Sequence, residues 1–168
     1  DPGNHYQGPA VIDIAAENLL IIGSAQFGKT NFIQSIIRSI ATNYGPDAAN
    51  FYVLDFGSMV LKNFENLKHV GGVVLPTEDE RIKNLFKLLI SEVTARKSKL
   101  LAVGVSSFAS YKEAGYTDMP QIILIVDNFT VFRELFYDKH EDEFIFLCRE
   151  GLATGISVIV SSPQTSGL

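Results

Sequence analysis

The stretch that most constrains the fold is residues 19–30, with the sequence LLIIGSAQFGKT. An apolar run typical of a β-strand leads directly into the pattern G-x-x-x-x-G-K-T, and a helical pattern follows from Asn31. A strand before and a helix after are the context that a phosphate-binding P-loop requires. Backbone N–H groups of such a loop point at phosphate oxygens, and the helix adds the positive end of its dipole. The stretch therefore predicts a nucleoside triphosphate site.

Within this motif, two side chains have specific expected roles. Lys29 can reach the β- and γ-phosphates, and the Thr30 hydroxyl can ligate Mg²⁺. The residues expected to form the binding cradle are Gly23, Ser24, Ala25, Gln26, Phe27, Gly28, Lys29 and Thr30.

A P-loop site also needs a carboxylate at the end of a neighbouring strand, where it holds Mg²⁺ through water. Residues 121–126 form a continuous apolar run typical of a central strand covered on both faces, and Asp127 closes it. Asp55 closes a second apolar run, residues 51–55, and is the alternative. We favour Asp127 because its strand is the more uniformly apolar.

Strand and helix patterns alternate along the chain, which predicts right-handed βαβ units and an α/β fold with a mainly parallel sheet flanked by helices. Residues 1–9 are expected to form a loop, and residues 57–68 are ambiguous. The expected strands are 11–14, 19–22, 51–55, 70–75, 121–127 and 156–160. The expected helices are 31–41, a long helix opened by a Thr-x-x-Glu capping box at 77–80 and ending near 103, 106–114, 129–136 and 141–153.

Composition limits the class of protein. The 168 residues fit one domain, 1–168, and no apolar run approaches the roughly 18–20 residues needed to span a bilayer. The single cysteine, Cys148, favours a reducing, cytoplasmic setting and is expected in the core. Because the chain begins without Met, we interpret it as an excerpt of a longer chain whose other segments could hold membrane helices.

Charge weighs against a nucleic-acid partner. The formal net charge is −5, whereas a surface that grips DNA usually carries clustered Lys and Arg. The densest basic cluster is Arg96, Lys97 and Lys99, which on a long helix is expected to be a solvated face. The histidines have no Cys or carboxylate at ligand spacing, so we expect no transition-metal site. Phe129, Phe132 and Phe136 share one helical face and are expected in the core.

The order of these motifs resembles the FtsK/SpoIIIE family of RecA-like motor ATPases. The segments that carry the resemblance are the P-loop, 51–55, the Glu-Val-Thr-Ala-Arg run at 92–96 before Gly104-Val105, 122–127, and Gly151-x-x-x-Gly155-Ile156. Asp127-Asn128-Phe129 and the acidic balance are most similar to the cytoplasmic, C-terminal ATPase domains of the EssC/EccC/YukB motors of bacterial type VII secretion.

The resemblance implies a RecA-like P-loop core that binds ATP and Mg²⁺ between subunits of a homo-hexamer. It also implies neighbouring ATPase domains in the same chain, a cytoplasmic position in a cell-membrane protein, and exported small helical proteins as partners. Two alternatives stay open: a DNA-translocating motor of the same fold, and an ATP-dependent assembly switch without transport. Steep salt dependence of DNA affinity would distinguish the former.

The chain departs from the family's pattern in the cradle and at the catalytic position. Gln26 and Phe27 stand where the family usually has Gly and a small residue, and both tolerate unusual backbone angles less freely than Gly. Asn128 stands where the family has a Glu that polarises the attacking water. An amide can position water but cannot accept its proton, so a catalytic factor of about 10²–10⁴ should be reduced.

Two further departures lie toward the end of the chain. Leu152 replaces an Arg that the family commonly carries, and its loss should lower the rate if that Arg acts on phosphate across an interface. The sensor segment, usually Thr-Gln-Arg, reads Ser162-Pro163-Gln164, in which Ser162 keeps a hydroxyl. Together the four departures predict a domain that binds ATP and hydrolyses it slowly.

Overall fold

A single parallel sheet forms the centre of the protein, whose computed structural model describes residues 17–22 and 26–163, with the backbone alone at 26 and 27. Its strand order is β1-β5-β4-β2-β3, and every pairing is parallel. The strands are β1 (Leu19–Ile22), β2 (Ala49–Asp55), β3 (Val70–Val74), β4 (Gln121–Asp127) and β5 (Ile156–Ser162). These confirm five of the predicted strands. The predicted loop 1–9 and strand 11–14 lie outside the described residues.

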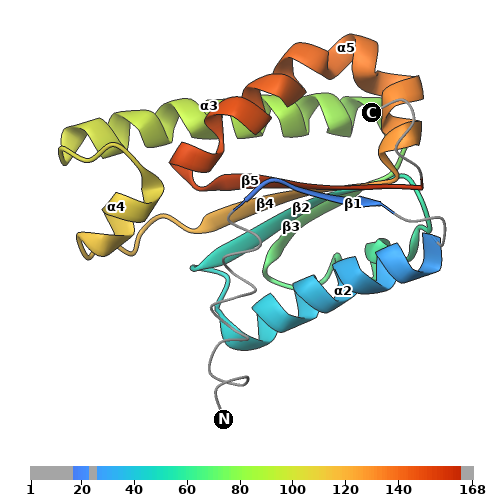
Figure 1. The fold of residues 1–168 in the computed structure, drawn as a ribbon, viewed down its shortest axis with the longest axis horizontal. Helices are drawn as coiled ribbons and strands as arrows, with labels where there is room; N and C mark the ends of the chain where they lie inside the picture. Colours follow the sequence, from blue (N-terminus) through green and yellow to red (C-terminus); the bar gives the residue numbers. More distant parts are fainter. Residues whose placement is uncertain (1–16, 23–25, 164–168) are drawn as a thin grey trace.

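Helices cover both faces of the sheet (Figure 1). Helix α2 (Gln26–Asn43) lies on one face, and α3 (Asp79–Ala102) and α5 (Phe129–Glu150) lie together on the other. The short helix α4 (Phe108–Glu113) sits beyond one end of the sheet. Two 3₁₀ turns, η1 (Val60–Phe64) and η2 (Leu152–Thr154), complete the described elements, and η1 falls in the segment that was ambiguous from sequence.

The prediction of two helices at 129–136 and 141–153 is wrong, because α5 is one helix. The residues between them, 137–140, contain neither Gly nor Pro, so no breaker interrupts the helix. His140 is buried and continues the apolar stripe by stacking on Phe86, with ring centroids 4.9 Å apart. The buried positions of α5 follow helical spacing along its length: Phe129, Phe132, Phe136, His140, Phe144 and Leu147.

The start of α3 also differs from the prediction. The residue before the helix is Glu78, whose side chain makes no capping bond, so residues 77–80 do not form a capping box. Its carboxylate instead accepts from the Leu75 N–H at 2.8 Å and pairs with Arg81 at 3.0 Å, which holds it against the preceding turn. The predicted apolar stripe of this helix is confirmed, because all five of its residues are buried: Ile82, Leu85, Phe86, Leu89 and Val93.

Strand β4 is buried along its whole length, as its apolar sequence predicted. Side chains alternate between faces of a strand, and here Leu124 and Val126 pack in the cluster beneath α3 and α5, whereas Ile123 and Ile125 pack in the cluster with α2. The next residue, Asp127, is therefore on the α2 face.

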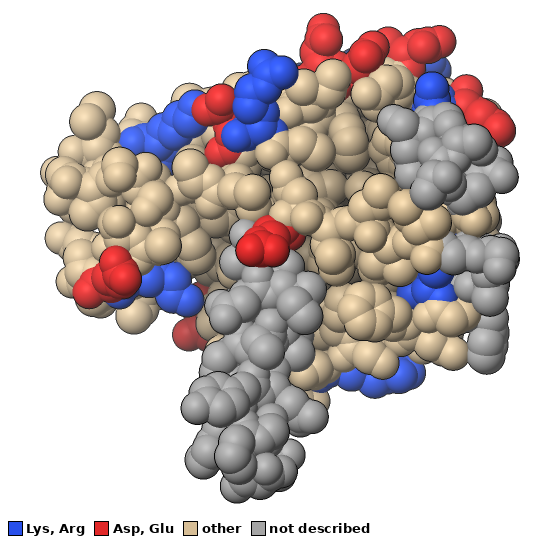
Figure 2. Space-filling model, in the orientation of Figure 1, with Lys and Arg blue, Asp and Glu red and all other residues tan. Residues whose placement is uncertain are grey.

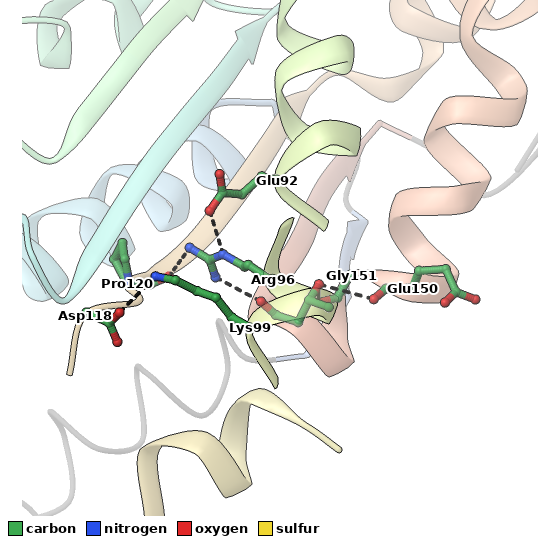
Figure 3. Close-up of polar contacts among 8 residues, drawn as sticks. Glu92, Arg96, Lys99, Asp118, Pro120, Glu150 and Gly151 are labelled. Carbon is green, nitrogen blue, oxygen red and sulfur yellow. Dashed lines mark hydrogen bonds and ion pairs between the residues drawn. The ribbon is translucent and has the colours of Figure 1, made fainter. Parts of the chain in front are cut away.

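Arg96 is buried, with 1% of its surface exposed, which contradicts the expected solvated face. Its guanidinium donates to Glu92 Oε2 at 2.9 Å, to the Thr154 carbonyl at 2.9 Å and to the Pro120 carbonyl at 2.6 Å (Figure 3). One side chain thus ties α3 to η2 and to the residue before β4. Helical spacing alone could not reveal these acceptors, because they lie 24 and 58 residues away.

Both glycines of the Gly151-x-x-x-Gly155 motif are closely packed, and Gly155 lies against this arginine. Gly155 has φ +83°, and a Cβ there would come within 2.9 Å of an Arg96 nitrogen and 2.6 Å of the Phe108 ring. A Cβ at Gly151 would come within 2.5 Å of the Leu147 carbonyl oxygen. Any residue with a Cβ would clash at either position, so both require glycine.

We expect Arg96→Ala to lower the free energy of unfolding by about 2–4 kcal/mol, because the buried Thr154 carbonyl and the part-buried Pro120 carbonyl lose their donor. Urea denaturation followed by circular dichroism measures the change. The control is Lys97→Ala on the same helix, whose exposed pair with Glu150 should contribute less than about 1 kcal/mol. Equal losses in the two variants would contradict the role assigned to Arg96.

Candidate functional site

The candidate site lies at the carboxyl edge of the sheet, where β1 ends and α2 begins (Figure 1). Strand β5 separates the P-loop strand β1 from β4, so the strand that carries the carboxylate is not the immediate neighbour we expected. Ser162 pairs with Ile22, and Val160 pairs with Val126, which places Ser161 beside Asp127. The end of β5 therefore lies between the P-loop and the carboxylate.

The second half of the P-loop motif forms the start of α2. Gly23, Ser24 and Ala25 lie outside the described residues, as do the side chains of Gln26 and Phe27. The helix begins at Gln26, five residues earlier than predicted, so the N–H groups of its first turn have no acceptor within the helix. A Cβ built on Gly28 would meet no atom of the described residues within 4 Å. Such an end suits an anion.

Two buried oxygens at this edge have no hydrogen-bond partner in the part of the chain that the structure describes. Thr30 is 4% exposed and Asp127 is 2% exposed. Among the described residues, neither Thr30 Oγ1 nor Asp127 Oδ2 has a hydrogen-bond partner. Leaving such a group unpaired costs about 1–3 kcal/mol. A hydroxyl and a carboxylate oxygen are ligands of the kind that Mg²⁺ takes, so these residues fit the metal that the motif implies. Lys29, also buried, precedes Thr30.

Asp55 lies in register with Asp127 on the neighbouring strand but has a different environment. Its two carboxylate oxygens accept the N–H groups of Met59, at 3.1 Å, and Leu61, at 3.0 Å. Burial raises the pKa of the Asp55 carboxyl. The hydrogen bond from Met59 lowers this pKa, and the negative charge of Asp127 raises it further. Asp55 thus holds the backbone that leads into η1, whereas Asp127 keeps one oxygen unpaired by the described residues.

Asn128 occupies a left-handed backbone conformation, with φ 73° and ψ 75°, at the start of α5. Asn adopts this region more readily than most residues. Its side-chain Oδ1 is buried and has no hydrogen-bond partner among the described residues.

Ser161 belongs to this site although the sequence did not single it out. Its Oγ donates to Asp127 Oδ1 at 2.8 Å and accepts from the Asn128 N–H at 2.9 Å. The sequence lacks a signal for this contact because strand order and register decide which residue of β5 meets Asp127. Ser162, the predicted sensor-like residue, is also buried, and its Oγ lies 3.5 Å from Thr130 Oγ1 of α5. Alternation along β5 places Ser162 on the other face.

The position that departs from the family's Arg lies far from this edge. Leu152 is 40% exposed in η2, directly before β5. Because β5 has seven residues, Leu152 is separated from the carboxyl edge by about 20 Å. Arg149, one turn earlier, is exposed at the same end. Gln164 lies outside the described residues.

Other polar groups do not form a second centre in the described residues. No cluster of three or more His, Cys, Asp or Glu residues there could hold a metal ion. Cys148 is half-buried at the border of the core, and burial raises the pKa of its thiol. Phe129, Phe132 and Phe136 pack in the core, as predicted. Across 17–22 and 26–163, no helix combines the length and apolar character that crossing a bilayer requires.

Comparisons with known proteins agree with this geometry. The model of the FtsK/SpoIIIE family matches residues 5–166. The type VII secretion system protein EssC of Staphylococcus aureus is 29% identical over 169 residues, which cover 99% of this chain and 11% of that protein. The chain therefore spans about a tenth of the length of this relative.

Two solved structures share the fold closely. EssC (ATPases 2 and 3) from Geobacillus thermodenitrificans superposes with a TM-score of 0.82 at 27% identity, over 91% of this chain and 29% of that one. EccC (ATPases 2 and 3) from Thermomonospora curvata, in complex with a signal sequence peptide, gives a TM-score of 0.80 at 29% identity, over 88% and 28%.

The family match covers nearly the whole chain, and these likenesses include the sheet and the helices that flank it. The chain belongs to the FtsK/SpoIIIE family and is homologous to the ATPase domains of the type VII secretion proteins EssC and EccC.

Proposed function

We propose that this chain is an ATP-binding domain of a type VII secretion motor and that it hydrolyses ATP slowly. The observation that carries the proposal is the pair of buried oxygens, Thr30 Oγ1 and Asp127 Oδ2, without partners in the described residues at the P-loop edge. The first-turn amides of α2 and the ammonium of Lys29 would bind the phosphates. Thr30 and Asp127 would hold Mg²⁺, which when bound neutralises charge on the phosphates.

Slow hydrolysis follows from two departures from the family's pattern, Asn128 at that site and Leu152 before the other end of β5. Asn128 can orient a water molecule through its amide, but it cannot take the proton that the family's Glu would accept. Leu152 removes the cation that would stabilise charge on a phosphate of a neighbouring subunit. ATP would then serve mainly as a ligand that regulates packing against other domains.

The partners we propose come from the relatives. The Thermomonospora curvata structure is a complex with a signal sequence peptide, and EssC and EccC contain several ATPases in one chain. We propose that this domain works beside such neighbouring domains, in a homo-hexamer on the cytoplasmic side of a membrane protein, and helps to bind and export small helical proteins. Acidic side chains over α5 (Figure 2) support a protein partner over DNA: Glu134, Asp138, Glu141 and Asp142.

The nucleotide site is tested by calorimetric titration with Mg-ATP. Lys29→Ala should weaken binding by about 10- to 100-fold, since a hydrogen bond to a charged group contributes about 1.5–3 kcal/mol. In the unmodified chain, ATP should bind more tightly in buffer with Mg²⁺ than in buffer with EDTA. Thr30→Val should abolish most of this difference in affinity. Thr94→Val, a change of the same kind on the exposed side of α3, is the control and should bind like the unmodified chain. Absence of ATP binding at millimolar concentration in the unmodified chain would overturn the proposal.

The choice between the two carboxylates is tested by their amides. Asp127→Asn should remove the Mg²⁺ dependence of ATP affinity and change stability little. Asp55→Asn should leave that dependence intact and lower the free energy of unfolding by about 1–3 kcal/mol, because an amide has one oxygen for two backbone donors. Paired measurements of calorimetry and urea denaturation check both. The reverse pattern would move the metal site to Asp55.

The missing base is tested at Asn128. Asn128→Glu should raise phosphate release by about 10²-fold, despite a cost of roughly 1–2 kcal/mol for a less suitable residue in the left-handed conformation. Asn128→Gln has the same length as the Glu variant and no base, so it should remain slow. Fast turnover by the unmodified chain, or equal rates in the two variants, would contradict the assignment.

A further inference from the structure

The Ser161 hydroxyl makes two hydrogen bonds at the end of β4. It donates to Asp127 Oδ1 at 2.8 Å and accepts from the Asn128 N–H at 2.9 Å. A serine hydroxyl has one proton to donate and lone pairs to accept, so one group serves both partners. Ser161 is fully buried, so water does not compete for these bonds. The hydroxyl therefore connects the Asp127 carboxylate with the backbone of the next residue.

The first bond distinguishes the two oxygens of Asp127. Oδ1 is occupied by Ser161, whereas Oδ2 is buried and has no partner among the described residues. Because one oxygen is fixed, the short side chain cannot rotate freely, and the orientation of Oδ2 is set before any ligand arrives. Groups that hydrogen-bond a metal ligand in this way typically change metal affinity by about 10- to 100-fold when they are removed.

The second bond acts on Asn128. This residue has a left-handed backbone, and its N–H is held by Ser161 rather than by a turn of α5. The bond fixes the direction in which the Asn128 side chain leaves the chain. One hydroxyl on β5 thus orients two consecutive residues of the candidate site.

We propose that Ser161 is a positioning residue of the Mg-nucleotide site, acting through the Asp127 carboxylate and the Asn128 backbone. The inference rests on the proposed ATP and Mg²⁺ binding and adds a residue to it. Ser161 need not touch the nucleotide, and its expected effect is on the metal-dependent part of the affinity.

The same strand supplies a matched control. Ser157 lies four residues before Ser161, so alternation places it on the same face, and it is also fully buried. In the described residues, Ser157 Oγ has no hydrogen-bond partner. Ser157→Ala therefore removes a buried hydroxyl from β5 without breaking a hydrogen bond to the described residues, whereas Ser161→Ala removes the hydroxyl and both bonds.

The test measures ATP affinity by calorimetry in Mg²⁺ and in EDTA. Ser161→Ala should weaken binding in Mg²⁺ by about 10- to 100-fold and leave binding in EDTA unchanged. Ser157→Ala should match the unmodified chain in both buffers, and Ser161→Thr, which keeps the hydroxyl, should restore the dependence on Mg²⁺. An equal loss in both buffers would mean a structural role and would overturn the inference.

A second measurement needs no variant and no nucleotide. In the unmodified chain, amide hydrogen exchange should show the Asn128 N–H protected, and rapid exchange there would overturn the inference. The two proposals also fail differently. If the unmodified chain binds Mg-ATP and Ser161→Ala keeps the full Mg²⁺ dependence, the role of Ser161 is wrong while the nucleotide site stands. If the unmodified chain binds no ATP, both are wrong.

Discussion

Burial of β4 on both faces is the constraint on which the site depends. Every residue of this strand is buried, between α2 on one side and α3 with α5 on the other. A strand in that position must be central, with β2 and β5 beside it, and its last residue then emerges between their ends. Asp127 is carried into the interior at the α2 face by the same alternation that fills the two cores. Its charge is thus placed by hydrophobic packing.

The two carboxylates at this edge differ in their hydrogen-bond donors, and this difference gives them different roles. Asp55 and Asp127 end adjacent strands in register, yet Asp55 is closed by two N–H groups and serves the turn into η1. Asp127 is held by one hydroxyl and keeps an oxygen for another partner. A buried carboxylate with one oxygen unpaired by the described residues lowers the free energy of unfolding. A cation that binds this oxygen offsets the loss.

Hydrophobic patterns and short motifs predicted the features of the fold that depend on residues close together in the sequence. The P-loop context, the apolar run before Asp127 and the stripe of α3 follow from residues close together in sequence. The continuity of α5, the burial of Arg96 and the contact of Ser161 with Asp127 were not predicted, because each depends on partners that only strand order and helix packing bring together. Arg96 is the clearest example. Its charge predicted a solvent-exposed position, but its guanidinium is buried against carbonyls that lie far along the chain.

The unbroken α5 has a mechanical consequence. It begins at Phe129, directly after Asn128 of the candidate site, and ends shortly before Thr154, whose carbonyl accepts from Arg96. With 22 residues the helix is about 33 Å long, and no loop interrupts it. Because its buried residues pack in the core along its length, and its last turn leads to Thr154, whose carbonyl accepts from Arg96, the helix joins the candidate site to the opposite end of the domain as one packed element.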